Sequence, residues 1–196
     1  GVSEAVDLAL RAIINPGDEV LIGEPCYVSY APSVSLAGGI PVLVPARAEE
    51  KFKLKKKDLI SHISSKSKAI LLSYPNNPTG AIMEKADLED IAQVARNYNL
   101  LVISDEVYAE LTYGRKHVSI STLEGMKERT ILLNGFSKAF AMTGWRLGYA
   151  AGPKEIIDAM LKIHQYTMLC APSLSQFAAV KALREGISFI DEMVKD

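Results

Sequence analysis

The sequence has few of the residues that mark several classes of protein. Its only two cysteines, Cys26 and Cys170, form no CxxC or Cys/His cluster, so neither a disulfide framework nor a zinc site is indicated. No apolar run approaches the roughly 20 residues that span a bilayer, and no signal peptide is recognisable. Neither sign of charge dominates, since 22 Lys and Arg face 23 Asp and Glu. This balance leaves no basic footprint for nucleic acid or a membrane surface. Because the cysteines show no disulfide pattern, we expect a protein of the reducing cytoplasm.

The length and composition are those of a folded domain. Apolar residues make up 48% of the chain and charged residues 23%, close to the averages for soluble globular domains, and 196 residues suffice for one well-buried core. The chain starts at Gly1 without an initiator methionine, and it stops at Asp196 inside a helical apolar pattern that covers 187–194. We therefore expect residues 1–196 to form a single domain and to be a fragment of a longer protein.

Short aliphatic runs alternate with stretches of helical periodicity along the chain. Runs bounded by Gly, Pro or Asn predict strands over 19–23, 40–45, 68–74, 100–106, 130–136 and 146–152. Helical spacing predicts a helix that starts at Ser3 as N-cap and ends before 15–18, and helices over 28–37, 84–99, 153–168 and 173–185. The lysine-rich stretch 51–60 begins another short helix, which we interpret as a solvated face. Because the strands are continuous aliphatic runs, we expect an α/β fold with a mostly parallel sheet covered by helices on both faces.

Polar side chains follow several of the predicted strands. In parallel sheets ligands bind at the carboxyl ends of strands, which makes Asn77, Asp105, Lys138 and Arg146 candidate site residues. Each has a purely structural interpretation when taken alone. An Asp after a strand caps the next segment, an Asn before Pro forms a turn, most lysines are solvated, and an arginine can simply pack its stem.

Taken together, these residue types suit one cofactor. A lysine forms a Schiff base with an aldehyde, and an arginine binds a phosphate through two hydrogen bonds. A carboxylate holds a pyridine nitrogen protonated, so that the ring withdraws electrons. Pyridoxal 5′-phosphate (PLP) needs all three groups, and the combination therefore predicts a PLP site.

An ordered set of motifs carries a resemblance to a known family. The chain reads, in order, GVSEA, NPGDEVLI, EPCYVSYAP, PNNPTG, SDEVY, NGFSKAFAMTGWRLGY and GPKE. Within this set Lys138 lies 33 residues after Asp105 and eight residues before Arg146. The sequence resembles the class I and II aminotransferases, PLP enzymes of fold type I that include the aspartate and aromatic amino acid enzymes. The resemblance covers nearly the whole chain and implies the mixed sheet and flanking helices of their large cofactor-binding domain.

The resemblance implies roles for four residues that act at the cofactor ring. Lys138 is expected to form the Schiff base with PLP and then to move the substrate's Cα proton. Asp105 is expected to pair with the pyridine nitrogen. Asn77, which also borders the substrate, and Tyr108 are expected to hydrogen-bond the ring oxygen O3′.

The resemblance implies further contacts at the phosphate and at the ring face. Arg146 is expected to bind the phosphate together with the backbone N–H groups of Val2 and Ser3 at the start of the first helix, a favourable place for an anion. Tyr27 lies where the family stacks an aromatic ring on the cofactor.

The sequence departs from the family pattern at two points. Many relatives have a serine as phosphate ligand three residues before the lysine, where this chain has Gly135, and Ser137 is the alternative hydroxyl. The resemblance also implies a C-terminal small domain with an arginine for the substrate carboxylate, and an N-terminal segment whose aromatic residue reaches the partner subunit. We expect both to lie outside residues 1–196.

The leading functional hypothesis is ping-pong transamination, in which an L-amino acid gives its amino group to the cofactor and a 2-oxo acid takes it up. A PLP-dependent C–S lyase or other eliminating enzyme uses the same fold and residues, and a non-catalytic domain is a third hypothesis. A nucleotide-binding domain is disfavoured, since neither GxGxxG nor GxxxxGK[ST] follows a strand. The resemblance also implies a homodimer, and the amino acid donor stays open.

Overall fold

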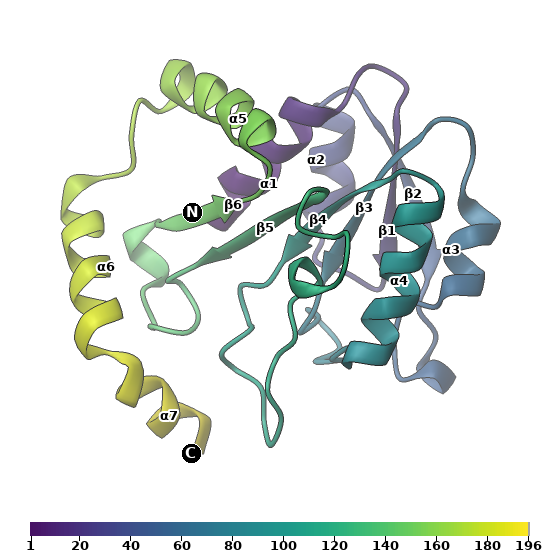
Figure 1. Cartoon of the computed structure of the whole chain (residues 1–196). Coiled ribbons are helices and arrows are strands. Elements are labelled where there is room, and N and C mark those ends of the chain that lie inside the picture. The colour runs from purple at the N-terminus through teal and green to yellow at the C-terminus, as the bar shows by residue number, and fades with distance from the viewer. Residues whose placement is uncertain (196) are drawn as a thin grey trace.

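The computed structural model describes residues 1–195 and contains one six-stranded sheet (Figure 1). Its spatial order is β2-β1-β3-β4-β5-β6, in which β6 is antiparallel to β5 and all other neighbours are parallel. The strands are β1 Glu19–Glu24, β2 Ile40–Pro45, β3 Ser67–Ser73, β4 Leu101–Asp105, β5 Thr130–Gly135 and β6 Gly148–Ala151. All six predicted strands and the mostly parallel α/β sheet are thereby confirmed.

Within residues 1–195, seven α-helices precede, connect or follow the strands. They are α1 Val2–Ile13, α2 Tyr30–Leu36, α3 Lys56–His62, α4 Lys85–Asn97, α5 Lys154–Thr167, α6 Ser173–Glu185 and α7 Ile187–Lys195. The prediction of Ser3 as the N-cap of the first helix is wrong, because the cap is Gly1. The Gly1 carbonyl accepts the N–H groups of Glu4 and Ala5, so Ser3 already lies in the first turn.

The sheet is covered on both faces, and this explains its continuous aliphatic strands. In β1, Val20 and Ile22 pack in the core shared with α1, α2 and α5, whereas Leu21 packs in the core shared with α3 and α4. Successive residues of a strand point to opposite faces, so a strand buried on both sides is apolar at every position. The aliphatic runs of the sequence therefore reflect two separate cores, one on each side of the sheet.

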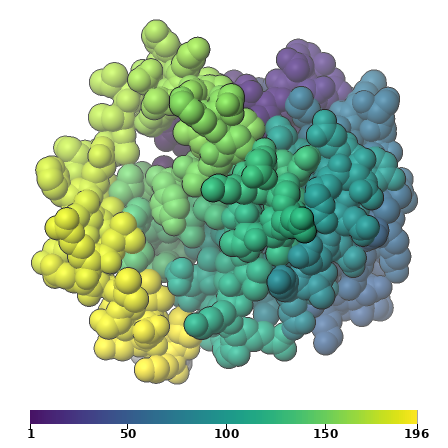
Figure 2. All heavy atoms as spheres, viewed as in Figure 1, coloured from purple at the N-terminus to yellow at the C-terminus, as the bar shows by residue number. Residues whose placement is uncertain are grey.

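Helices α6 and α7 lie apart from these two cores. A third, small cluster joins α6 to the segment after β5, and its buried members are Phe136, Met142, Leu147 and Ala179. Figure 2 shows the yellow atoms of α6 and α7 along one edge of the molecule, where Leu174 and Phe177 each stay 77% exposed. In the described part of the chain, none of the helices has the length and apolar character needed to cross a bilayer.

Candidate active site

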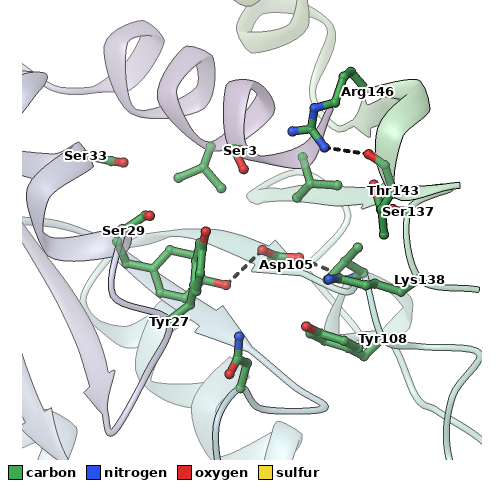
Figure 3. A pocket seen from close by; sticks show the side chains of 15 residues that line it. Ser3, Tyr27, Ser29, Ser33, Asp105, Tyr108, Ser137, Lys138, Thr143 and Arg146 are labelled. Atoms are coloured by element: carbon green, nitrogen blue, oxygen red, sulfur yellow. Dashed lines mark hydrogen bonds between the residues drawn. The ribbon is translucent and has the colours of Figure 1, made fainter. Parts of the chain in front are cut away.

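A cavity of about 380 Å³ opens where the carboxyl ends of the parallel strands meet the start of α1 (Figure 3). All eight residues that the sequence predicts for the site line it: Val2, Ser3, Tyr27, Asn77, Asp105, Tyr108, Lys138 and Arg146. Ser137 also lines the cavity, as do residues that sequence analysis did not single out, among them Ser29, Tyr30, Ser33 and Thr143. Side chains up to 144 positions apart in the sequence thus share one small volume.

Asp105 is the last residue of β4 and lies at the floor of the cavity. Its carboxylate is only 6% exposed and accepts hydrogen bonds from Tyr30 Oη at 2.8 Å and from Val107 N at 3.1 Å. Burial raises the pKa of the Asp105 carboxyl, and these two hydrogen bonds oppose the rise. Both donors are neutral, so neither of them supplies a positive charge to balance the carboxylate. Such a site suits a positively charged ligand atom.

Lys138 follows β5 and extends into the same space. Its half-buried side chain places Nζ 5.6 Å from the centre of the Tyr108 ring. In Figure 3 the amine points toward Asp105, above the Tyr108 ring. Among the residues that line the cavity Lys138 is the one amine-bearing side chain, and it is therefore the group available to attack a carbonyl carbon there.

The opposite end of the cavity is suited to an anion. Arg146 is held in a left-handed backbone conformation, with φ of 52°, and its Nη1 donates to the Thr143 carbonyl at 2.9 Å. Its guanidinium lies beside the start of α1, where the N–H groups of Val2 and Ser3 have no acceptor within residues 1–195. A helix N-terminus next to a guanidinium is a typical phosphate site.

The three remaining predicted residues, Tyr27, Asn77 and Tyr108, also line the cavity. The Tyr27 ring is 38% exposed and contacts the Tyr30 ring edge to face, with centroids 5.6 Å apart. In the turn after β3, the Asn76 side chain accepts from Thr79 and donates to the Pro25 carbonyl. Asn76 is thus structural, whereas Asn77 faces the cavity.

Positions 135 and 137 are the two places where the sequence leaves room for a phosphate-binding hydroxyl. Ser137 lines the cavity, whereas Gly135 does not and is closely approached by Val2, Leu147 and Gly148. A Cβ atom at position 135 would lie 2.9 Å from Val2 Cγ2 and 3.0 Å from the Leu147 carbonyl oxygen. A serine at position 135 therefore does not fit this chain, since the backbone oxygen cannot move aside as a flexible side chain could.

We expect Gly135→Ser to lower the free energy of unfolding by about 1–3 kcal/mol through overpacking. The matched control is Gly144→Ser, because a Cβ atom there has no neighbour within 4 Å. Urea unfolding followed by circular dichroism measures both variants. Equal midpoints for the two variants would show that β5 can shift away from Val2 and accept the larger residue.

A buried carboxylate network fixes the segment that follows Asp105. Glu106 is 3% exposed and accepts from the hydroxyls of Ser104 and Ser119 at 2.9 and 2.7 Å, and His117 Nε2 lies 2.7 Å from it. Glu106 directly follows β4, and its side chain lies among residues of the α4 side such as Leu88, whereas Asp105 lines the cavity. The two carboxylates are therefore neighbours in the sequence but have different tasks. Asp105 faces the cavity, and Glu106 binds the segment that carries His117 and Ser119.

We expect Glu106→Ala to lower the free energy of unfolding by about 2–4 kcal/mol, because it leaves two hydroxyls and an imidazole without their buried partner. Asp158→Ala is the control, since Asp158 pairs with Lys154 on the exposed side of α5 and its loss should leave the unfolding midpoint unchanged. The same urea assay applies. A midpoint for Glu106→Ala equal to that of the parent protein would mean that water replaces the carboxylate without cost.

The cavity offers an amine, a buried carboxylate with neutral partners, and a guanidinium beside a helix N-terminus. No group of three or more His, Cys, Asp or Glu side chains within residues 1–195 is placed to hold a metal ion. The donor set fits a ligand with an electrophilic carbon, a protonated ring nitrogen and a phosphate. Lys138 and Asp105 lie near each other, and Arg146 lies apart from them beside the start of α1, as a ligand with a phosphate at one end requires.

Comparisons with known proteins agree with this arrangement. A family model described as aminotransferase class I and II matches residues 1–196. The chain is 53% identical over 195 residues to a putative aminotransferase of Bacillus subtilis, YugH, and 48% identical over 199 residues to an aspartate aminotransferase of Pyrococcus abyssi. A crystal structure of an aromatic aminotransferase from Pyrococcus horikoshii superposes with a TM-score of 0.96 at 47% identity.

These matches cover all of this chain but only part of each relative. They span 100% of this chain, but 50% and 51% of the two relatives and 53% of the crystal structure's chain. The chain therefore spans about half the length of the proteins it matches. Every residue that lines the cavity lies within the matched region. By the match along its whole length, the chain belongs to the class I and II aminotransferases.

Proposed function

We propose that the protein transfers an amino group between an L-amino acid and a 2-oxo acid, with PLP as its cofactor. One observation carries the proposal: Lys138, Asp105 and Arg146, which come from three separate strand ends, line a single cavity of about 380 Å³. Two of the relatives have names that specify aspartate or aromatic amino acids as substrates, which supports amino acids as the substrate class.

PLP supplies an aldehyde that binds amines and a ring that withdraws electrons from the carbon next to the bound nitrogen. The residues of the cavity fit each part of it. Lys138 Nζ would hold the aldehyde carbon as a Schiff base, with the aldehyde oxygen leaving as water, and Arg146 with the N–H groups of Val2 and Ser3 would hold the phosphate. The Asp105 carboxylate, whose two hydrogen-bond donors are neutral, holds the proton on the ring nitrogen.

The same residues then orient and move protons. Lys138 Nζ, which lines the cavity, would act as the general base that takes the proton from the substrate's Cα, since such a base must lie within reach of the proton that it removes. Asn77 and Tyr108 would hydrogen-bond the ring oxygen O3′, and Tyr27 would lie against the ring. The Ser137 hydroxyl takes the place of the serine that cannot fit at Gly135.

We further propose that residues 1–196 are the large cofactor-binding domain of a cytoplasmic homodimer. The support is that the chain spans about half the length of its relatives. In this proposal the arginine that binds the substrate carboxylate belongs to a small domain outside these residues. The domain, location and partner are all carried over from the family.

The test is the absorbance of the protein with PLP before and after borohydride reduction, followed by mass spectrometry of the digested protein. We expect a single reduced adduct, on Lys138. In a separate, unreduced sample of PLP-loaded protein, amino acids are added one at a time, and those that are substrates should yield their 2-oxo acid in step with loss of the PLP absorbance. Adducts scattered over surface lysines would contradict the proposal, and release of ammonia with a cleaved side chain would indicate elimination instead.

A further inference from the structure

Tyr30 is a buried cavity residue for which the proposed mechanism has no role. It is the first residue of α2, is 3% exposed, and donates its hydroxyl to Asp105 Oδ2 at 2.8 Å. Its ring makes an edge-to-face contact with Tyr27. A buried ring at the start of α2 therefore carries the hydroxyl that reaches Asp105.

The hydrogen bonds to Asp105 come from two different elements. Val107 N, on the backbone after β4, donates to Oδ1, while Tyr30 from α2 donates to Oδ2. The terminal torsion of an aspartate is broad and soft, and a donor at each oxygen restricts it from both sides. A carboxylate has about four acceptor positions, so both oxygens keep one free for a ligand in the cavity.

We propose that Tyr30 is a positioning residue, whose hydroxyl fixes the orientation of the Asp105 carboxylate toward the ring nitrogen of the cofactor. The inference rests on the proposed function, because it assigns Asp105 its role at that nitrogen. Tyr30 acts through Asp105, and its own oxygen takes no proton in the reaction.

The chemistry of a buried phenol suits this task. Burial, and then the nearby Asp105 carboxylate, raise the pKa of Tyr30, so the hydroxyl stays a donor throughout the neutral range. The same hydrogen bond favours the charged form of Asp105 against the desolvation that burial imposes. The other titratable groups around Asp105 are Glu106 next in the chain, Tyr108 in the following turn, Lys138 after β5 and Cys26 before α2.

The test compares Tyr30→Phe with Tyr74→Phe. Tyr74 is the matched control, since it is also buried and its hydroxyl also makes hydrogen bonds, to Leu54 N and the Phe52 carbonyl, away from Asp105. The first readout is the pKa of Asp105 in cofactor-free protein, from the pH titration of its side-chain carboxyl ¹³C signal, with Asp105→Asn for assignment. We expect Tyr30→Phe to raise this pKa by about one unit and Tyr74→Phe to leave it unchanged.

The second readout is the rate at which PLP-loaded protein reacts with an amino acid in a single turnover. We expect Tyr30→Phe to slow this reaction about tenfold at saturating amino acid. The reason is that a less ordered carboxyl with a higher pKa leaves the proton less firmly on the ring nitrogen. Tyr74→Phe should react at the parent rate. An unchanged Asp105 pKa, or an unchanged rate in a Tyr30→Phe protein that forms the Lys138 adduct, would overturn the inference. Failure of the proposed function has a different signature, the absence of that adduct in the parent protein.

Discussion

A Lys138→Ala protein is expected to form no borohydride-stable adduct with PLP and to lose amino transfer by roughly 10⁴-fold or more. Two roles are lost at once, since the Nζ atom is both the amine that binds the cofactor and the base that moves the Cα proton. No second amine-bearing side chain lines the cavity within residues 1–195, so none can take over. The prediction therefore depends on the placement of one atom.

Mass spectrometry after reduction and a single-turnover assay measure the two losses. Lys138→Arg is the informative companion variant, because a guanidinium keeps the positive charge near Tyr108 but does not act as a nucleophile at neutral pH. Lys154→Ala, at an exposed position of α5, is the control for surface lysines. An adduct that persists at full yield in Lys138→Ala would remove Lys138 from its role.

An Asp105→Asn protein is expected to retain the PLP adduct on Lys138 but to transfer amino groups about 10²–10⁴-fold more slowly. Asparagine keeps the shape of the side chain and can still accept the Val107 N–H. It cannot neutralise a protonated ring nitrogen, so the ring no longer withdraws electrons from the substrate's Cα. The adduct yield and the single-turnover rate therefore separate binding from chemistry.

The same substitution should act on stability in the opposite direction. Folding raises the pKa of Asp105, chiefly through burial, so the folded state binds its proton more tightly than the unfolded state does. Stability contributed by this group is lost as the pH rises from the unfolded pKa through the raised folded pKa. At pH 7 we expect cofactor-free Asp105→Asn to unfold at a temperature no lower than the parent protein, with the difference vanishing at low pH.

Asp58→Asn provides the matched control for both measurements. Asp58 is also a poorly exposed carboxylate, but its Oδ1 lies 2.8 Å from Arg47 Nη1 and it does not line the cavity. We expect this variant to unfold at a lower temperature than the parent protein and to keep its activity. A lower unfolding temperature for Asp105→Asn than for Asp58→Asn would show that the cavity carboxylate stabilises the fold.

The parts of the fold that sequence analysis predicts are those with local signals. The six strands are recognisable because they are short, mostly apolar runs with Gly, Pro, Asn or Asp at or near their ends. The eight site residues are recognisable because they lie within the family motifs. The cap of α1 is mispredicted because Gly1 caps through its backbone, which leaves no side-chain signal.

Other features depend on contacts that no local pattern encodes. The hydrogen bond from Tyr30 to Asp105 joins positions 75 residues apart, and a tyrosine at the start of a helix gives no hint of it. The exclusion of a serine at position 135 depends on the close approach of Val2, from α1, to Gly135. The Glu106 network similarly requires the loop that carries His117 and Ser119 to fold back on β4.

The wide sequence separation of the cavity walls sets an order of events during protein synthesis. Val2 is made 144 residues before Arg146, which at roughly 5–20 residues per second is a delay of at least about seven seconds. Until Arg146 has left the ribosome, the early wall of the cavity faces water and has no counterpart. A nascent chain without Arg146 cannot hold a ligand that needs both walls. Such a ligand would therefore stabilise only chains in which β6 has paired with β5.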